Sequence, residues 1–371
     1  MTSARETRDM LEQAVEQMLA RHHSADALCE GKPKNDLWEF LVELGLPAAE
    51  LPETCGGLDV AFTDVAPTLR LAGRVLATTY LTEFAIIGAW LVSACASESH
   101  ADLLKQATMG EVRIALAFAE HGDGGDLAFT RTRASAAPDG WTLTGNKNLV
   151  VGGDRATHFV VPAIMGDGSG DLGLFLLPTD APGLTRHEVE LYDGSHAADL
   201  ALQNVACVAP TVLARGSEAR DLIELALDRG RAALAHEIVG LIEAVQEITL
   251  EYVKTRKQFG QPIGAFQTMQ HRMADMWMEL ELARSCAQLA TDAIAASDSA
   301  DARQQAVSAA ISSICDHARL VGQSAVQAHG GIALTREYLV GHYFKRLAMA
   351  ERYLGNGDYH LDRYVALANR N

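Results

Sequence analysis

Three long apolar stripes in the second half of the chain restrict its fold more than any other feature. Within each stripe the apolar residues recur every three or four positions, which is the spacing of one face of an α-helix. Long helices of this kind pack as an antiparallel bundle. The stripes consist of Ile238, Leu241, Ile242, Val245, Ile248 and Tyr252; of Met269, Met273, Met276, Trp277, Leu280, Ala287 and Ile294; and of Val307, Ile311, Ile314, Ala318 and Val321.

The pattern changes twice along the chain. Residues 1–113 show helical spacing in "TRDMLEQAVEQMLA" and "DLWEFLVELGLPAAEL", whereas residues 114–215 hold short runs such as "WTLTGNKNLVVGG", "THFVVPAIM", "LGLFLLP" and "DLALQNVACV" that are typical of β-strands. Helical spacing returns over residues 216–371. The sequence predicts an α+β, mostly α protein with an N-terminal helical domain, a middle β-domain and a C-terminal antiparallel bundle. A Rossmann fold is disfavoured, because βαβ alternation does not occur.

Composition narrows the classes of protein. The 371 residues are 48% hydrophobic and carry a net charge of −17, which argues against nucleic-acid binding. The six cysteines are scattered without CxxC or metal-ligand spacing, so we expect reduced thiols and no metal site. The polar N-terminus is unlike a signal peptide, and "ATTYLTEFAIIGAWLVSACA" is short for a membrane span and contains Thr and Glu. We therefore expect a cytoplasmic protein without a membrane segment.

The stretch "EYVKTRKQFGQPIGAFQ" ends the first long helix on a fixed cation, Arg256, three residues before Phe259. An arginine at a helix C-terminus can simply interact with the helix dipole, and the Gly330–Gly331 pair after the third stripe can simply end a helix. The alternative is that both features face an anionic ligand.

The order of the three parts, with "RKQFG" after the first long helix and "QAHGG" after the third, resembles the acyl-CoA dehydrogenase family over nearly the whole chain. "AFAEHGDGGD" stands where that family has a Thr-Glu-Pro-Gly-type turn, and "GNKNLVVGG" where it has Gly-x-Lys-x-Trp-Ile-Thr-Asn-Gly. The segment "VGHYFKRLAMAERYLGNGDYHLDR" resembles the small subunit of the heteromeric branch, such as the pimeloyl-CoA and steroid side-chain enzymes.

The resemblance implies FAD bound across a subunit interface. Arg256 would meet the FAD pyrophosphate of a neighbouring subunit's site. Phe259, Phe266 and Gln267 would line the same approach, and Gln327 with Gly330 and Gly331 would let the backbone come close to the cofactor.

The family pattern breaks at the catalytic base. In the family, a glutamate removes the α-proton of an acyl-CoA thioester while the flavin accepts the β-hydride. The two positions at which family members place that glutamate match Gly230 and Leu354, and neither side chain can accept a proton. Asp358 and Glu351 are weak substitutes, since each lies about one helical turn from Leu354; surface acids on helices are the alternative reading.

The half of the flavin cradle in the middle domain is also reduced. Ala119 replaces the family threonine, and Leu149, Val150 and Val151 replace Trp-Ile-Thr. Glu120, Gly122, Gly125 and Asp126 keep the turn of the motif. A basic group near the C-terminus would meet phosphates of FAD or CoA, or would form ion pairs within the bundle; it consists of Arg336, His342, Lys345 and Arg346.

The leading hypothesis is a non-catalytic small subunit of an α2β2 acyl-CoA dehydrogenase of lipid or steroid catabolism. A larger subunit would carry the base and most of the acyl-CoA site, and an electron-transfer flavoprotein or similar acceptor would take the electrons. The alternatives are a self-sufficient homo-oligomeric flavoenzyme with Asp358 or Glu351 as base, and a flavin-free scaffold subunit.

Overall fold

The structure, a computed structural model, describes residues 4–32, 36–95, 98–122, 126–166, 171–208, 211–296 and 299–370. The chain divides into two compact units. Unit 1 comprises Met1–Leu37, Phe62–Thr78 and Arg231–Asn371, and unit 2 comprises Trp38–Ala61 and Thr79–Gly230. Helix α8 (Gly216–Thr255) contributes to both units. The helical N- and C-terminal parts and the β-rich middle part agree with the predicted fold class, while the predicted boundaries at residues 113 and 215 stay a prediction.

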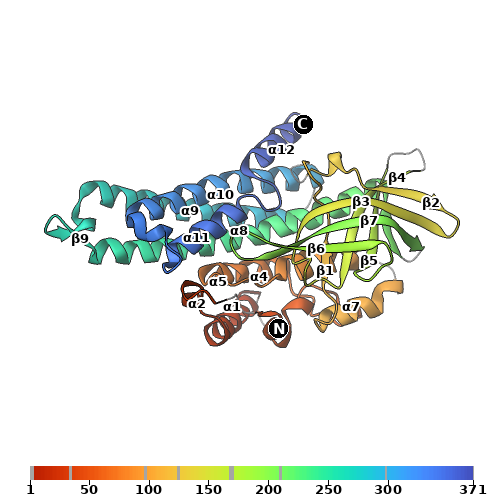
Figure 1. Cartoon of the computed structure of the whole chain (residues 1–371), viewed down its shortest axis with the longest axis horizontal. Helices are drawn as coiled ribbons and strands as arrows, with labels where there is room; N and C mark the ends of the chain where they lie inside the picture. Colours follow the sequence, from red (N-terminus) through yellow and green to blue (C-terminus); the bar gives the residue numbers. More distant parts are fainter. Residues whose placement is uncertain are drawn as a thin grey trace. The chain divides into compact units, whose positions relative to one another are not determined.

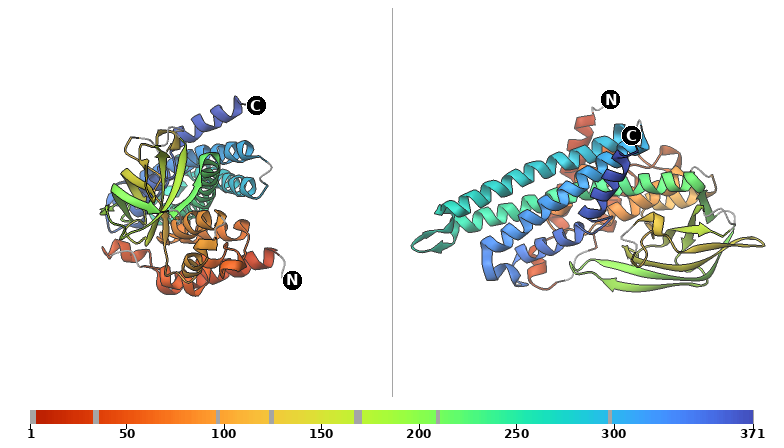
Figure 2. Two further views of the ribbon diagram at one scale, coloured as in Figure 1. Left: turned by 90° about the vertical axis from the view of Figure 1, so that its right-hand side faces the viewer. Right: turned by 90° about the horizontal axis from the view of Figure 1, so that it is seen from above.

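Unit 1 is a helical bundle. Figures 1 and 2 show α9 and α10 side by side along its length, with α11 and α12 following them in the chain. Besides the second part of α8, the unit contains α1 (Ala4–His22), α2 (Asp26–Cys29), α4 (Phe62–Val65), α5 (Leu69–Arg74), α9 (Gln267–Ala296), α10 (Ala300–His329), α11 (Leu339–Ala350) and α12 (Gly357–Ala368), the short helices η3 (Ala66–Thr68), η8 (Ile263–Ala265) and η9 (Gly330–Leu334), and the strands β9 (Lys257–Gln258) and β10 (Gln261–Pro262).

The apolar stripes mostly form the core of this bundle, as predicted. The third stripe is buried throughout, and so are the first four members of the first stripe. The second stripe is partly wrong, because Trp277 is 57% exposed while Met276 and Leu280 on the same helix are buried. Local signals delimit the helices: the Ser299 hydroxyl caps α10 by accepting from the N–H of Ala302, and Gly330 follows its last residue with a φ of 63°.

Helices α5 and α8 cross in unit 1 at two glycines. A Cβ on Gly73 would lie 2.2 Å from the carbonyl oxygen of Glu237, and one on Gly240 would lie 1.9 Å from that of Arg70. Only glycine permits an approach this close. The crossing therefore places the arginines of α5 beside the acidic residues of α8.

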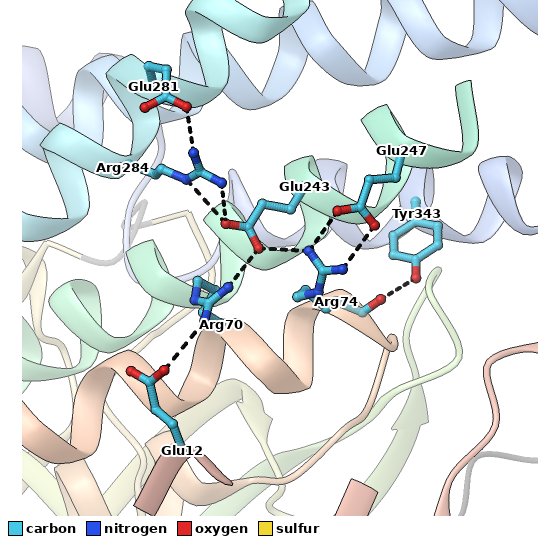
Figure 3. Close-up of polar contacts among 8 residues, drawn as sticks. All are labelled: Glu12, Arg70, Arg74, Glu243, Glu247, Glu281, Arg284 and Tyr343. Atoms are coloured by element: carbon cyan, nitrogen blue, oxygen red, sulfur yellow. Dashed lines mark hydrogen bonds and ion pairs between the residues drawn. The ribbon is translucent and has the colours of Figure 1, made fainter. Parts of the chain in front are cut away.

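An ion-pair network follows from this crossing (Figure 3). The Glu243 side chain is 3% exposed and accepts from Arg70 at 3.0 Å, from Arg74 at 3.1 Å and from Arg284 at 2.9 Å. Arg74 also pairs with Glu247 at 2.9 Å, and Arg284 with Glu281 at 2.5 Å. Burial raises the pKa of Glu243, but the three guanidinium groups outweigh this effect and hold the pKa below its usual range. The network joins α5, α8 and α9, and it extends to α1 because Arg70 also pairs with Glu12 at 3.5 Å.

Unit 2 is built on a mixed sheet with the strand order β6-β7-β3-β2-β4-β5-β8 and with β1 beside β4. The β1–β4 and β2–β4 pairs are parallel and the other described pairs are antiparallel. Its strands are β1 (Ile114–Leu116), β2 (Arg133–Ala137), β3 (Gly140–Val151), β4 (His158–Met165), β5 (Leu172–Pro178), β6 (Leu184–Glu190), β7 (His196–Val208) and β8 (Val212–Arg215); its helices are α3 (Trp38–Glu43), α6 (Trp90–Ala94), α7 (Ala101–Thr108), η1 (Leu46–Ala48), η2 (Glu53–Cys55), η4 (Thr82–Ala89), η5 (Glu98–His100) and η6 (Leu127–Phe129).

The four runs that predicted strands correspond to β3, β4, β5 and β7. The predicted helix in "DLWEFLVELGLPAAEL" is shorter than expected, because α3 ends at Glu43 and Gly45 takes a left-handed φ of 73°. The apolar run after residue 77 forms η4, a π-helix that is largely buried, and then α6, in which Leu91 and Val92 are buried. In the described part of the chain, no helix is long and apolar enough to cross a membrane.

Candidate cofactor-binding site

Helix α8 is followed by a two-residue β-hairpin that presents Arg256 and Phe259. Gln258 pairs with Gln261 across the turn, and both turn residues have positive φ, 52° for Phe259 and 82° for Gly260. This combination defines a type I′ turn, which favours Asn-Gly over Phe-Gly. The Arg256 carbonyl accepts from Ile263 at 2.8 Å, so the hairpin folds back onto the end of the helix.

Phe259 is both strained and solvent-facing. Its side chain is 92% exposed, and its ring contacts Phe266 edge-on with the centroids 6.2 Å apart. A left-handed conformation costs a bulky residue on the order of 1–3 kcal/mol. No buried contact repays that cost within the described chain, which is the pattern expected of a residue held out for a ligand or partner.

The remaining predicted contact residues lie on two further elements of unit 1. Gln267 is the exposed first residue of α9, and Gln327 is exposed in the last turn of α10. The end of α10 lies against the end of α8, because the Tyr252 hydroxyl donates to the His329 carbonyl at 3.5 Å and the two rings stack at 4.3 Å. Tyr252 is one turn before Arg256, so the structure brings the two sequence motifs to neighbouring helix ends.

This end of the bundle suits an anionic ligand. Among the described residues, the Arg256 side chain has neither a hydrogen-bond nor an ion-pair partner, and it is exposed. A Cβ added to Gly330 or Gly331 would meet nothing within 4 Å, so the backbone there is open to close approach. An unpaired guanidinium beside an open glycine turn fits a pyrophosphate.

The turn of the middle domain is held from inside. The Glu120 carboxylate accepts from the Lys147 ammonium at 2.7 Å and from the Thr132 hydroxyl at 2.7 Å, and the Lys147 side chain is fully buried. Burial raises the pKa of Glu120, but Lys147 and Thr132 outweigh it, so the pKa lies below its usual range. The N–H of Asn148 donates to the Ala119 carbonyl at 2.9 Å and joins the turn to β3.

The same region offers few side-chain groups to a flavin. Leu149 lies at a β-bulge with a φ of 50° and is 53% exposed, and its N–H donates to Asp199 at 2.8 Å. Ala119 and Val151 carry no hydroxyl. Gly125 lies outside the described residues, and Gly122 has a left-handed φ of 81°. In the described part of the motif, the polar side chain of Glu120 is used by the fold.

Leu354, at one of the two positions of the family base, has a strained backbone whose carbonyl accepts two hydrogen bonds. Leu354 has a φ of 61° and is 3% exposed, and its carbonyl accepts from Arg231 Nε at 3.0 Å and from His360 Nε2 at 3.2 Å. Arg231 and His360 are fully buried. The sequence analysis did not identify this pair, although a charge inside the apolar run "LDRGRAAL" was a signal for Arg231. Gly230, at the other base position, is a buried residue of α8.

The substitute acids occupy ordinary positions. Glu351 forms an ion pair with Arg319, and Asp358 is exposed in the first turn of α12, where a carboxylate favours the helix N-terminus. Glu237 forms an ion pair with Arg346 at 2.6 Å, so one member of the basic group follows the second of the two alternatives, an ion pair within the bundle. His342 Nε2 lies 2.9 Å from the Arg336 carbonyl.

Comparison with known proteins identifies matches over most of the chain. Residues 115–205 match the model of the acyl-CoA dehydrogenase middle domain, and residues 220–366 match that of the acyl-CoA dehydrogenase C-terminal domain. The chain is 29% identical over 334 residues to the probable acyl-CoA dehydrogenase YngJ of Bacillus subtilis, covering 87% of this chain and 86% of that protein.

Two solved structures extend the similarity to the fold. A variant of the Tcur3481-Tcur3483 steroid acyl-CoA dehydrogenase superposes with a TM-score of 0.88 at 29% identity, covering 99% of both chains. The ChsE4-ChsE5 complex of Mycobacterium tuberculosis superposes with a TM-score of 0.86 at 22% identity, covering 100% of this chain and 99% of that one. Because the two family models together match more than half of the sequence, the chain belongs to the acyl-CoA dehydrogenase family.

Proposed function

We propose that this chain is the non-catalytic subunit of a heteromeric, flavin-dependent acyl-CoA dehydrogenase. One observation carries the proposal. The chain leaves a cation and a strained aromatic ring exposed at one end of its bundle, while both positions matched to the family base hold residues without a proton acceptor. Such a chain can complete a cofactor site but cannot remove the α-proton of an acyl thioester.

The cofactor contacts follow from the exposed groups. Arg256 would bind the FAD pyrophosphate of a site formed with the partner subunit, and the Gly330–Gly331 turn would give the backbone access to it. Phe259, Phe266, Gln267 and Gln327 would line the same approach. When bound, the flavin supplies hydride acceptance from the substrate β-carbon. This chain's own residues would hold and orient the cofactor.

An exposed apolar surface supports a partner subunit. Helices α9 and α12 leave apolar side chains uncovered in unit 1, namely Trp277, Met278, Leu282 and Leu289 on α9 and Leu361, Tyr364 and Val365 on α12. Apolar residues that gather on one element commonly mark interaction sites. The name of the Tcur3481-Tcur3483 relative joins two components. We infer an α2β2 assembly in which the larger subunit supplies the base and binds most of the acyl-CoA, with an electron-transfer flavoprotein as acceptor.

The test begins with the visible spectrum of the full-length chain purified alone and then co-purified with an adjacent dehydrogenase-like gene product. Flavin bands at about 370 and about 450 nm, typical of oxidised flavin, are expected only in the complex. Arg256→Ala should weaken flavin retention at least tenfold without changing the primary isotope effect on α-proton removal. Arg220→Ala, which removes the same charge from an exposed site on the first turns of α8, should retain flavin normally.

The alternatives predict different outcomes. If the chain alone is yellow and reduces a dye with an acyl-CoA, and Asp358→Asn or Glu351→Gln abolishes that activity, the chain is a self-sufficient enzyme. A colourless complex would identify a flavin-free scaffold. Either outcome overturns the proposal.

A further inference from the structure

His329 is a buried histidine at the end of α10, directly before the Gly330–Gly331 turn. Its side chain is 5% exposed. The Nδ1 atom lies 2.8 Å from the carbonyl oxygen of Ala325, one turn earlier in the same helix. Since a carbonyl oxygen only accepts hydrogen bonds, Nδ1 carries the proton of the neutral ring.

This tautomer leaves Nε2 as a bare acceptor. Nε2 is buried and has no hydrogen-bond partner among the described residues. The ring packs against two aromatic side chains, with centroids 4.3 Å from Tyr252 and 5.2 Å from Tyr338, and the centroids of these two rings are 6.4 Å apart. A neutral ring tolerates this setting, but a second proton would create a buried N–H donor with no acceptor, which is unfavourable.

The groups around the ring offer no charge to compensate. The titratable groups that face it are the phenols of Tyr252 on α8 and of Tyr338, which precedes α11; its own helix contributes the Ala325 carbonyl. Among the described residues, no carboxylate or cationic side chain forms a hydrogen bond or an ion pair with it. Burial lowers the pKa of His329, although the hydrogen bond to Ala325 opposes this shift. At the C-terminal end of α10, where the helix dipole is negative, the Ala325 carbonyl already accepts from Nδ1 of the same ring.

His329 is connected to both parts of the candidate site, the Gly330–Gly331 turn and the end of α8 that carries Arg256. Gly330 follows it with a φ of 63°, and the His329 carbonyl accepts from the Tyr252 hydroxyl, one helical turn before Arg256. If the ring leaves its contacts with Tyr252 and Tyr338, the glycine turn and the end of α8 therefore lose the packing that holds them together.

We propose that His329 is a pH-sensitive positioning residue for the Gly330–Gly331 turn. In its neutral form the ring holds the turn; when Nε2 gains a proton, the ring leaves its contacts with Tyr252 and Tyr338 and the turn loosens. Release of flavin from the complex then accelerates as the pH falls below neutrality. The last step rests on the function proposed above, whereas the first two concern this chain alone.

The first experiment measures hydrogen–deuterium exchange of the Gly330 and Gly331 amides in the full-length chain without flavin, expressed as protection factors that remove the intrinsic pH dependence of exchange. Protection should fall at least fivefold between pH 7.5 and pH 5.5. His329→Asn retains a short N–H donor for the Ala325 carbonyl and does not titrate, so its protection should be independent of pH. His342→Asn, a control at an exposed histidine contact, should behave as the unchanged protein does.

The second experiment follows flavin release from the co-purified complex by stopped-flow fluorescence over the same range. Release should accelerate at least fivefold in the unchanged complex and stay constant with His329→Asn. A pH-independent protection factor in the unchanged chain overturns the inference, and so does an equal pH response in His329→Asn. A colourless complex overturns the proposed function but not the role of His329 in the turn, which the exchange measurement decides by itself.

Discussion

The turn that carries Glu120 and the bundle end that carries Arg256 both contain charged residues of family motifs, but they use those charges in opposite ways. Glu120 is buried and bound to Lys147 and Thr132. Arg256 is exposed and has no partner among the described residues. The comparison teaches that charged residues of family motifs can be placed in two ways: the first region pairs its charges within the fold, and the second leaves its charge exposed, as the proposed contact with another molecule requires.

Backbone strain shows the same division. Leu354 is left-handed and buried, and two buried donors fix its carbonyl. Phe259 is also left-handed, yet 92% of its side chain is exposed. Strain in the first case is stabilised by the interior. The strain at Phe259 is not offset by buried contacts, so a substitution that relieves this strain should not destabilise the fold.

The largest expected effect on the free energy of unfolding is at the buried ion pair of Glu120 and Lys147. Glu120→Gln leaves the Lys147 ammonium buried without its counter-charge, so the free energy of unfolding should fall by about 4 kcal/mol at pH 7. Urea denaturation measures this loss. The double variant Glu120→Gln/Lys147→Met should recover more than half of it, because no charge is then left unpaired. Glu190→Gln, at an exposed position of β6, should change the unfolding free energy by less than about 0.5 kcal/mol.

The same pair predicts an acid dependence. The folded-state pKa of Glu120 lies below the ordinary value of 4.5, so its contribution to stability is fully present above that value and is lost as the pH falls through the folded-state pKa. The difference in unfolding free energy between the unchanged protein and Glu120→Gln should therefore shrink below about pH 4.5. A difference that stays constant down to pH 3 would show that the carboxylate charge does not stabilise the turn.

A smaller effect on the free energy of unfolding is expected at the Arg231–Leu354–His360 clamp, in which Arg231 and His360 donate to the Leu354 carbonyl. Arg231→Met removes a charged donor from the Leu354 carbonyl but leaves that of His360, so the free energy of unfolding should fall by about 2 kcal/mol. Arg319→Met, which removes a partly exposed ion pair with Glu351, should cost less than about 1 kcal/mol. Thermal unfolding of the two variants side by side distinguishes them, and equal losses would mean that Arg231 does not fix this turn.

The sequence predicted the helical stripes and four strands because the buried face of a helix or strand places apolar residues at a regular spacing along the chain. Ile311 and Val321, for example, lie in the core where the helical spacing places them. Trp277 was misplaced because periodicity identifies a large apolar residue but does not show whether another surface covers it. Strands β6 and β2 gave little signal, since most residues of β6 are exposed and polar and β2 is rich in alanine.

The candidate site was predictable only where a motif is local in the sequence. Arg256, Phe259 and Gly260 lie close together in the chain, so the sequence could single out this stretch, although it did not predict the hairpin. The Arg231–Leu354–His360 clamp joins residues more than a hundred positions apart, and the stack of Tyr252, His329 and Tyr338 joins three elements. Such contacts are set by tertiary packing, which no short window of sequence contains.

The smallest effect on stability, and the sharpest test of the comparison, is expected at Phe259. Phe259→Asn gives the hairpin the Asn-Gly pair that a type I′ turn favours, which relieves the strain of a bulky left-handed residue and loses only an exposed edge contact with Phe266. The free energy of unfolding should rise by up to about 0.5 kcal/mol. Flavin retention by the co-purified complex should nevertheless weaken severalfold, because the exposed ring is absent. A variant that is less stable and retains flavin fully would show that Phe259 serves the fold, and the contrast with Glu120 would then disappear.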